Sequence, residues 1–198
     1  MTVDDVLAYP HQIGDALWRI EAAGLSRPPA GTVAVCGPSG GAGALAALAG
    51  ADARDGLGSE GDALVLCVSY SGDDQEALAC FEEAGKRGAP RAVVCTAGTL
   101  AARAREEGVP VIGVPAGLPG GGAIVYFLLA ALYCAGYPVE AEAESAAATL
   151  SRLAEEWGAK PPPGPVSAGG TPLERVLAEV FRRDLEAAYA AAGDDPDG

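Results

Sequence analysis

The sequence predicts an α/β domain, a three-layer α/β/α sandwich around a parallel sheet, followed by one further C-terminal helix. Over the first 158 residues, short apolar runs alternate with longer segments of helical periodicity, and the first two runs end in turns rich in glycine or serine. Strands that alternate with helices in this way pair in parallel through right-handed crossovers. With 198 residues, 49% of them hydrophobic, the chain can bury one such core.

Each element follows from a local pattern. Uninterrupted apolar runs predict buried strands, and apolar residues repeating every three to four positions predict helices. The expected strands are 32–36, 63–68, 91–95 and 109–114. The expected helices are 4–23 (interrupted at Pro10), 44 to about 50, 74–87, 100–107, 123–137, 140–157 and 171–191. Polar residues 51–62 are expected to form a loop, and the sheet to be of the flavodoxin-like type.

Domain boundaries follow from composition. Residues 1–158 are expected to form the domain, and the proline- and glycine-rich segment 159–170 a linker. Residues 171–192 predict an amphipathic helix with Thr171 as its N-cap, and 193–198 an acidic tail. The segment 123–137 is apolar on all sides but too short for a confident membrane span, which favours a buried helix, with a subunit interface as one place for it.

Charge and cysteine content exclude several functions. A net charge of −14 argues against nucleic acid and membrane surfaces as partners, and it requires any anion site to be built locally. The five cysteines are widely spaced without a C-x-x-C pair, and there is one histidine, so no metal site is expected and the cysteines are expected to be buried free thiols. The N-terminus has no basic n-region, which predicts a cytoplasmic protein.

Two strand-to-helix turns carry the candidate chemistry. The first, residues 37–43 (GPSGGAG), follows a strand and opens a helix, where backbone N–H groups and the helix N-terminus favour an anion. It does not satisfy G-x-G-x-x-G, and no acidic residue is expected to close the following strand, so no dinucleotide or other cofactor is predicted. In the second, residues 68–76 (VSYSGDDQE), the hydroxyls of Ser69 and Ser71 and the helix N–H groups are placed to hold an oxyanion.

The second turn resembles the S-x-S-G-x-T-x-E signature of sugar isomerase (SIS) domains. With residues 10–13 (PHQI), Cys36-Gly37 and residues 118–123 (LPGGGA), it is similar to the bifunctional phosphoglucose/phosphomannose isomerases over roughly residues 4–137. The resemblance implies the SIS fold, a sugar-like ligand at the strand ends, and pairing with a second copy or a related SIS chain. The candidate ligand-binding residues are Ser39, Gly40, Gly41, Ser69, Ser71, Asp73, Asp74, Gly120 and Gly121.

The chain departs from the family pattern at positions that matter for chemistry. The family's phosphate-binding serine falls at or near Gly41, its phosphate-binding threonine at Asp74 and its substrate arginine at Gly120. The family's second SIS domain, which supplies the catalytic glutamate and histidine, has no counterpart in these 198 residues. Two carboxylates, Asp73 and Asp74, stand where relatives hold a dianion. These departures predict that phosphosugar isomerisation is lost.

Alternative interpretations remain at each position. Asp73 and Asp74 are helix-capping acids or, alternatively, bind an amine or a cation. The glycines at 40–43 permit close strand–helix packing or approach a ligand, and those at 120–122 form a loop or an anion-binding nest. His11 is a surface or interface residue, or a catalytic one in a site shared across a homodimer.

Three functions are consistent with these observations. The first is a degenerate SIS protein that binds a sugar-like or small polar metabolite. The second is an isomerase or repurposed enzyme whose site is completed by a dimer mate, and the third is a regulatory or structural subunit with an empty site. A dimer is expected, with 123–137 and the C-terminal helix as its contact surfaces.

Overall fold

The computed structural model describes residues 1–25, 32–58, 64–118, 123–158 and 170–193, so most of the linker predicted at 159–170 and most of the tail lie outside the described residues. Its five-stranded parallel sheet has the order β2-β1-β3-β4-β5, the order of flavodoxin-like sheets. The strands are β1 (Val33–Cys36), β2 (Ala53–Asp55), β3 (Leu64–Val68), β4 (Arg91–Cys95) and β5 (Val111–Gly113). The predicted parallel α/β architecture is confirmed.

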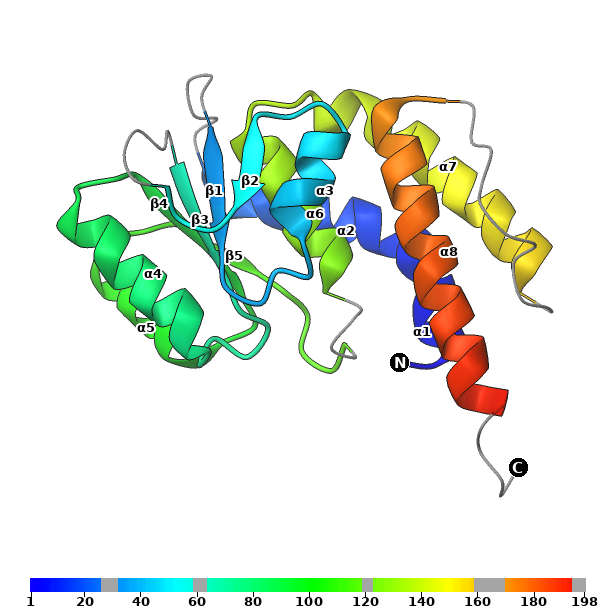
Figure 1. The fold of residues 1–198 in the computed structure, drawn as a ribbon, viewed down its shortest axis with the longest axis horizontal. Helices are drawn as coiled ribbons and strands as arrows, with labels where there is room; N and C mark the ends of the chain where they lie inside the picture. Colours follow the sequence, from blue (N-terminus) through cyan, green and yellow to red (C-terminus); the bar gives the residue numbers. More distant parts are fainter. Residues whose placement is uncertain (26–31, 59–63, 119–122, 159–169, 194–198) are drawn as a thin grey trace.

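Helices cover both faces of the sheet (Figure 1). One face packs against α4 (Gln75–Lys86) and α5 (Gly98–Glu106). The other face packs against α2 (Tyr9–Ala22), α3 (Ala42–Leu48) and α6 (Ile124–Cys134). Outside this second layer lie α1 (Val3–Leu7), α7 (Val139–Trp157) and α8 (Pro172–Gly193). The arrangement is therefore a three-layer sandwich with additional helices on one side.

The edge strand β2 is an element that the sequence does not predict. Residues 51–62 predict a polar loop, but Ala53–Asp55 pairs in parallel with β1, with Val35 opposite Asp55. A three-residue strand with a single apolar side chain leaves no periodic signal. Gly43 allows α3 to pack closely against β2, because a Cβ on Gly43 would overlap the backbone of Arg54 and hold the helix away from the strand. The glycine thus serves packing, one of the two interpretations of this turn.

Helix α6 is the centre of the larger hydrophobic core. All of its residues except Tyr133 are buried, and it packs against α2, α3 and α7 within the same chain. The apolar surface that suggested a subunit contact at 123–137 is therefore satisfied internally. None of the helices in the described part of the chain is long and apolar enough to cross a membrane.

The cysteines depart from the sequence-based expectation. Cys36, at the end of β1, is joined by a disulfide to Cys80 in α4, with the two Cα atoms 6.3 Å apart, within the usual range for a disulfide. Cys67, Cys95 and Cys134 are buried free thiols, as expected. Spacing along the chain could not reveal the pair, because 44 residues separate the two cysteines and the fold of β1 against α4 brings them together.

Helix α8 is held on the domain by an aromatic contact. The ring of Phe181 stacks on Trp157, at the end of α7, with centroids 6.1 Å apart and planes at 23°, and it also meets the edge of Tyr9. Thr171 is the N-cap as predicted, since its Oγ accepts a hydrogen bond from the Glu174 N–H at 3.2 Å. This packing places the middle of α8 near the first glycine turn.

Candidate ligand-binding site

The two turns singled out in the sequence lie side by side at the carboxyl edge of the sheet. They follow β1 and β3, which are hydrogen-bonded neighbours, yet α3 and α4 leave these strands toward opposite faces. In open α/β sheets, ligands bind at such a point, where the direction of winding changes. In the structure, the parts of these turns that lie between strand and helix are residues 37–41 and 69–74, because α3 begins at Ala42 and α4 at Gln75.

The first turn is occupied by a carboxylate of the protein itself. Asp55, the last residue of β2, accepts hydrogen bonds from the Ser39 hydroxyl at 3.0 Å, the Gly43 N–H at 3.0 Å and the Ala44 N–H at 3.1 Å. Ser39 is buried, and its Oγ also accepts from the Gly41 N–H at 3.2 Å. The donors that would hold an anion at the start of α3 therefore already hold Asp55.

The strand that follows the glycine turn, β2, thus does end in an acidic residue, Asp55, contrary to the sequence-based expectation. In dinucleotide-binding folds such a residue hydrogen-bonds a ribose. Here the Asp55 carboxylate is directed back to the first turn of α3, where it complements the positive end of the helix. A dinucleotide is accordingly disfavoured by the missing G-x-G-x-x-G pattern and by this engagement of Asp55.

The second turn is likewise capped from within. Asp74 is the N-cap of α4, and its Oδ1 accepts from the N–H groups of Glu76 at 3.0 Å and Ala77 at 3.1 Å. Ser69, which is buried, accepts from the N–H groups of Gly72 at 3.0 Å and Asp74 at 3.4 Å. These contacts support the helix-capping interpretation of Asp74, and they place the Ser69 hydroxyl in the folding of the turn.

Asp73 serves a third helix. Its Oδ1 accepts from the backbone N–H of Thr99 at 2.9 Å and from the Thr99 hydroxyl at 2.8 Å, in the first turn of α5. Those two hydrogen bonds lower the pKa of the Asp73 carboxyl below its ordinary value. Ser71, which is exposed, accepts from the Asp73 N–H at 3.2 Å. The two neighbouring aspartates therefore point to different helices.

A cavity of about 110 Å³ opens beside the first turn, between that turn, the start of α6 and the middle of α8. It is lined by Pro38, Ser39, Gly40, Ile124, Phe127, Arg183 and Asp184. Asp184 is buried, and its carboxylate accepts from the Tyr9 hydroxyl at 2.9 Å and the Arg183 Nε at 3.0 Å. Burial, followed by the neighbouring Asp184 carboxylate, raises the pKa of Tyr9.

The predicted site residues outside the second turn have different places in the structure. Ser39 and Gly40 line the cavity, while Gly41 takes a left-handed conformation (φ 83°) as the N-cap of α3. His11 is exposed on the first turn of α2 and is not among the residues that line this cavity. Gly120 and Gly121 lie outside the described residues.

Three residues of the site are missed by the sequence-based prediction. Asp55 depends on the unpredicted strand β2, so no local pattern marks it. Arg183 and Asp184 lie on the C-terminal helix, far from the turns in sequence. A signal for Asp184 exists, because it falls on the apolar face of α8 that contains Leu177, Phe181 and Leu185. A charged residue on such a face requires a buried partner.

Comparison with curated proteins gives relatives named bifunctional phosphoglucose/phosphomannose isomerase. The Aquifex aeolicus protein is 46% identical over 56 residues, covering 28% of this chain and 18% of that protein. The Caldicellulosiruptor bescii protein is 32% identical over 99 residues, and the Thermoplasma acidophilum protein 34% identical over 94, each covering 48% of this chain and 29% of the relative. The resemblance predicted from the sequence is confirmed. The matches to these isomerases span less than a third of their length, and no family model matches the chain.

Two solved structures share the fold. A proposed phosphosugar isomerase from Silicibacter pomeroyi aligns over 100% of both chains with a TM-score of 0.60 and 16% identity. A hypothetical protein from Thermus thermophilus aligns with a TM-score of 0.52 and 18% identity, over 94% of this chain and 47% of that one. At these identities, the likeness concerns the fold.

Proposed function

We propose that this protein binds a sugar-like or other small polar metabolite at the carboxyl edge of the sheet, and that it does not isomerise phosphosugars. The occupancy of the anion-binding donors carries this proposal. The first-turn N–H groups of α3 are bonded to Asp55 and those of α4 to Asp74. A phosphate would have to displace a carboxylate at either helix.

The relatives support the sugar-like ligand. Their names describe enzymes of phosphorylated sugars, and the SIS resemblance implies a sugar at the edge where the two turns lie. The cavity next to Ser39 supports a small ligand or one end of a larger one, because its volume of about 110 Å³ is below the 300–1,000 Å³ of typical ligand pockets.

The test compares binding with turnover. Glucose, mannose and their 6-phosphates are titrated by calorimetry, and conversion of fructose 6-phosphate to glucose 6-phosphate is assayed in parallel. We expect weak binding of the neutral sugars, weaker binding of the phosphates, and absent or trace conversion. A turnover number near the enzyme median of about 10 per second contradicts the loss of isomerase activity. Absence of binding to all four compounds supports an empty regulatory subunit instead.

An enzyme with a site shared across a homodimer is the second candidate. The exposed position of His11 favours it, because an exposed imidazole can reach the site of a neighbouring subunit. Trp18 and Leu48 are 63% and 75% exposed and support a contact between copies better than the buried helix α6 does. Light scattering tests for the dimer. Turnover of any sugar derivative that His11→Ala abolishes, without a change in thermal stability, favours this candidate.

A further inference from the structure

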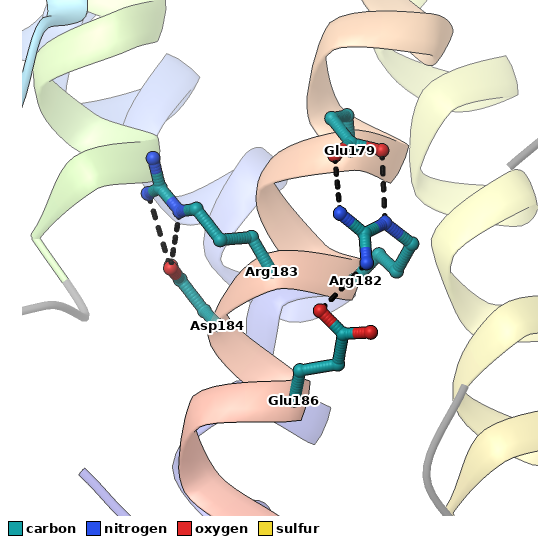
Figure 2. Close-up of polar contacts among 5 residues, drawn as sticks. All are labelled: Glu179, Arg182, Arg183, Asp184 and Glu186. Atoms are coloured by element: carbon teal, nitrogen blue, oxygen red, sulfur yellow. Dashed lines mark hydrogen bonds and ion pairs between the residues drawn. The ribbon is translucent and has the colours of Figure 1, made fainter. Parts of the chain in front are cut away.

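The C-terminal helix contributes two charged side chains to the cavity beside the first turn. Figure 2 shows Arg183 and Asp184 on one side of α8, whereas Arg182 lies on the other side with Glu179 and Glu186. The Arg183–Asp184 pair lines the cavity together with Ser39 and Gly40. The pair is therefore separated from the ion pairs that Arg182 makes on the same helix.

The polar groups of this pair retain hydrogen-bonding capacity. Asp184 accepts one bond from Tyr9 on Oδ2, and Oδ1 accepts from Arg183. Each carboxylate oxygen has two lone pairs, so Oδ2 can accept one more bond. Arg183 directs Nε and Nη2 at Asp184, and its Nη1 has no partner among the residues that the structure describes. The Arg183 side chain is 55% exposed, which leaves that nitrogen accessible.

The remaining wall of the cavity is apolar. Ile124 and Phe127 come from the first turns of α6 and line the cavity. An apolar wall with a few placed polar groups is the usual composition of a small-molecule site. A sugar ring presents C–H groups and hydroxyls at different surfaces, so it matches such a wall opposite a polar pair.

The charges select against a phosphate. The positive charge of Arg183 is neutralised by Asp184. At the first turn, the Asp55 carboxylate accepts a hydrogen bond from the Ser39 hydroxyl and adds a further negative charge. A ligand here meets one donor and one acceptor without an excess of positive charge. Two neighbouring hydroxyls satisfy both, because one donates to the Asp184 carboxylate and the other accepts from the Arg183 guanidinium, and hydrogen bonds to charged groups are the stronger ones.

We infer that Arg183 and Asp184 form a subsite on α8 that recognises the vicinal hydroxyls of an unphosphorylated sugar. This inference rests on the proposed function, since it names the ligand class and the recognising residues of that site. It extends the site from the two turns to the C-terminal helix, and it assigns to Arg183 the recognition of ligand oxygens.

The experiment measures the binding of glucose and mannose to the full chain by saturation-transfer NMR and calorimetry. Arg183→Ala should weaken binding of whichever sugar the wild type binds by at least tenfold. Arg182→Ala removes the same charge one residue away, on the other side of α8, and should stay within twofold of the wild type. Melting temperatures of both variants verify that α8 remains packed.

Each outcome has a distinct meaning. Equal binding by wild type and Arg183→Ala overturns the subsite and leaves the proposed function standing. An equal loss in both arginine variants overturns it as well, because the effect is then one of overall charge or of helix packing. Absence of sugar binding to the wild type refutes the sugar ligand of the proposed function and the subsite together. Tighter binding of the 6-phosphates than of the neutral sugars refutes the selection against phosphate.

Discussion

Replacing the N-cap of α4 tests whether the protein's own carboxylates exclude phosphate from the site. Asp74→Thr removes one negative charge and keeps a side-chain oxygen that can cap the helix. The N–H groups of Glu76 and Ala77 are both bonded to the Asp74 carboxylate. A threonine hydroxyl caps one of them, so the other becomes available to an anion. The expected result is a gain in affinity for glucose 6-phosphate and for inorganic phosphate.

The size of the gain follows from the charge that is removed. Two unit charges about 4 Å apart interact by about 1 kcal/mol in water and about 4 kcal/mol at the effective dielectric constant near a protein surface. Asp74 is partly buried, so the repulsion falls between these limits. We expect at least a tenfold increase in affinity, equivalent to about 1.4 kcal/mol. Because threonine is also a good N-cap, stability should fall by no more than about 1 kcal/mol.

Calorimetry at low salt measures this effect, and Glu76→Gln is the matched control. Glu76 is exposed in the same first turn and caps no N–H group among the residues that the structure describes, so its replacement removes the same charge without freeing donors. A comparable gain in both variants would show that general charge, rather than occupied donors, weakens phosphate binding. Unchanged affinity in Asp74→Thr would refute the reasoning, because the α4 N-terminus would then not face the ligand.

Three further predictions concern stability. Denatured protein should show three reactive thiols without reductant and five with it, and five reactive thiols without reductant would contradict the Cys36–Cys80 pairing. Loss of this disulfide should lower the free energy of unfolding by about 4 kcal/mol. Because the pKa of Asp73 is lowered in the folded state, its stabilising contribution is present above about pH 4 and is lost as the pH falls further, so acid titration should bring wild type and Asp73→Asn closer in stability. Gly43→Ala should destabilise the fold by about 1–3 kcal/mol in urea titrations, whereas Gly14→Ala, which meets nothing within 4 Å, should not destabilise it.

The sequence predicts those parts of the fold whose signals are local. The strands β1, β3, β4 and β5 are marked by uninterrupted apolar runs and most of the helices by apolar periodicity, while the buried helix α6 is marked by the length of its apolar run. Strand β2 could not be found, because Ala53 is its one buried side chain and its existence depends on pairing with β1. The disulfide is invisible for a related reason, since Cys36 and Cys80 meet through the packing of α4 against β1.

The sequence predicts the edge of the sheet where the two turns lie, but not the hydrogen-bond partners of their side chains. Ser39 and Ser69 belong together because both follow neighbouring parallel strands, and the carboxyl ends of such strands share an edge. The partners of their hydroxyls depend on longer-range geometry, since Asp55 reaches Ser39 from an adjacent strand. Arg183 lies still further away and reaches the site through the packing of α8 on α7, which no periodicity within α8 specifies.

The aromatic stack between α7 and α8 makes the docking of the C-terminal helix observable by optical spectroscopy. The chain has two tryptophans in opposite environments, with Trp18 63% exposed and Trp157 3% exposed. Trp157 is covered by Phe181 of α8, so release of that helix would shift its emission to longer wavelength and open it to a soluble quencher. Replacing Trp18 with phenylalanine leaves Trp157, at the end of α7, as the single reporter of the docking of α8, the helix that carries the inferred subsite.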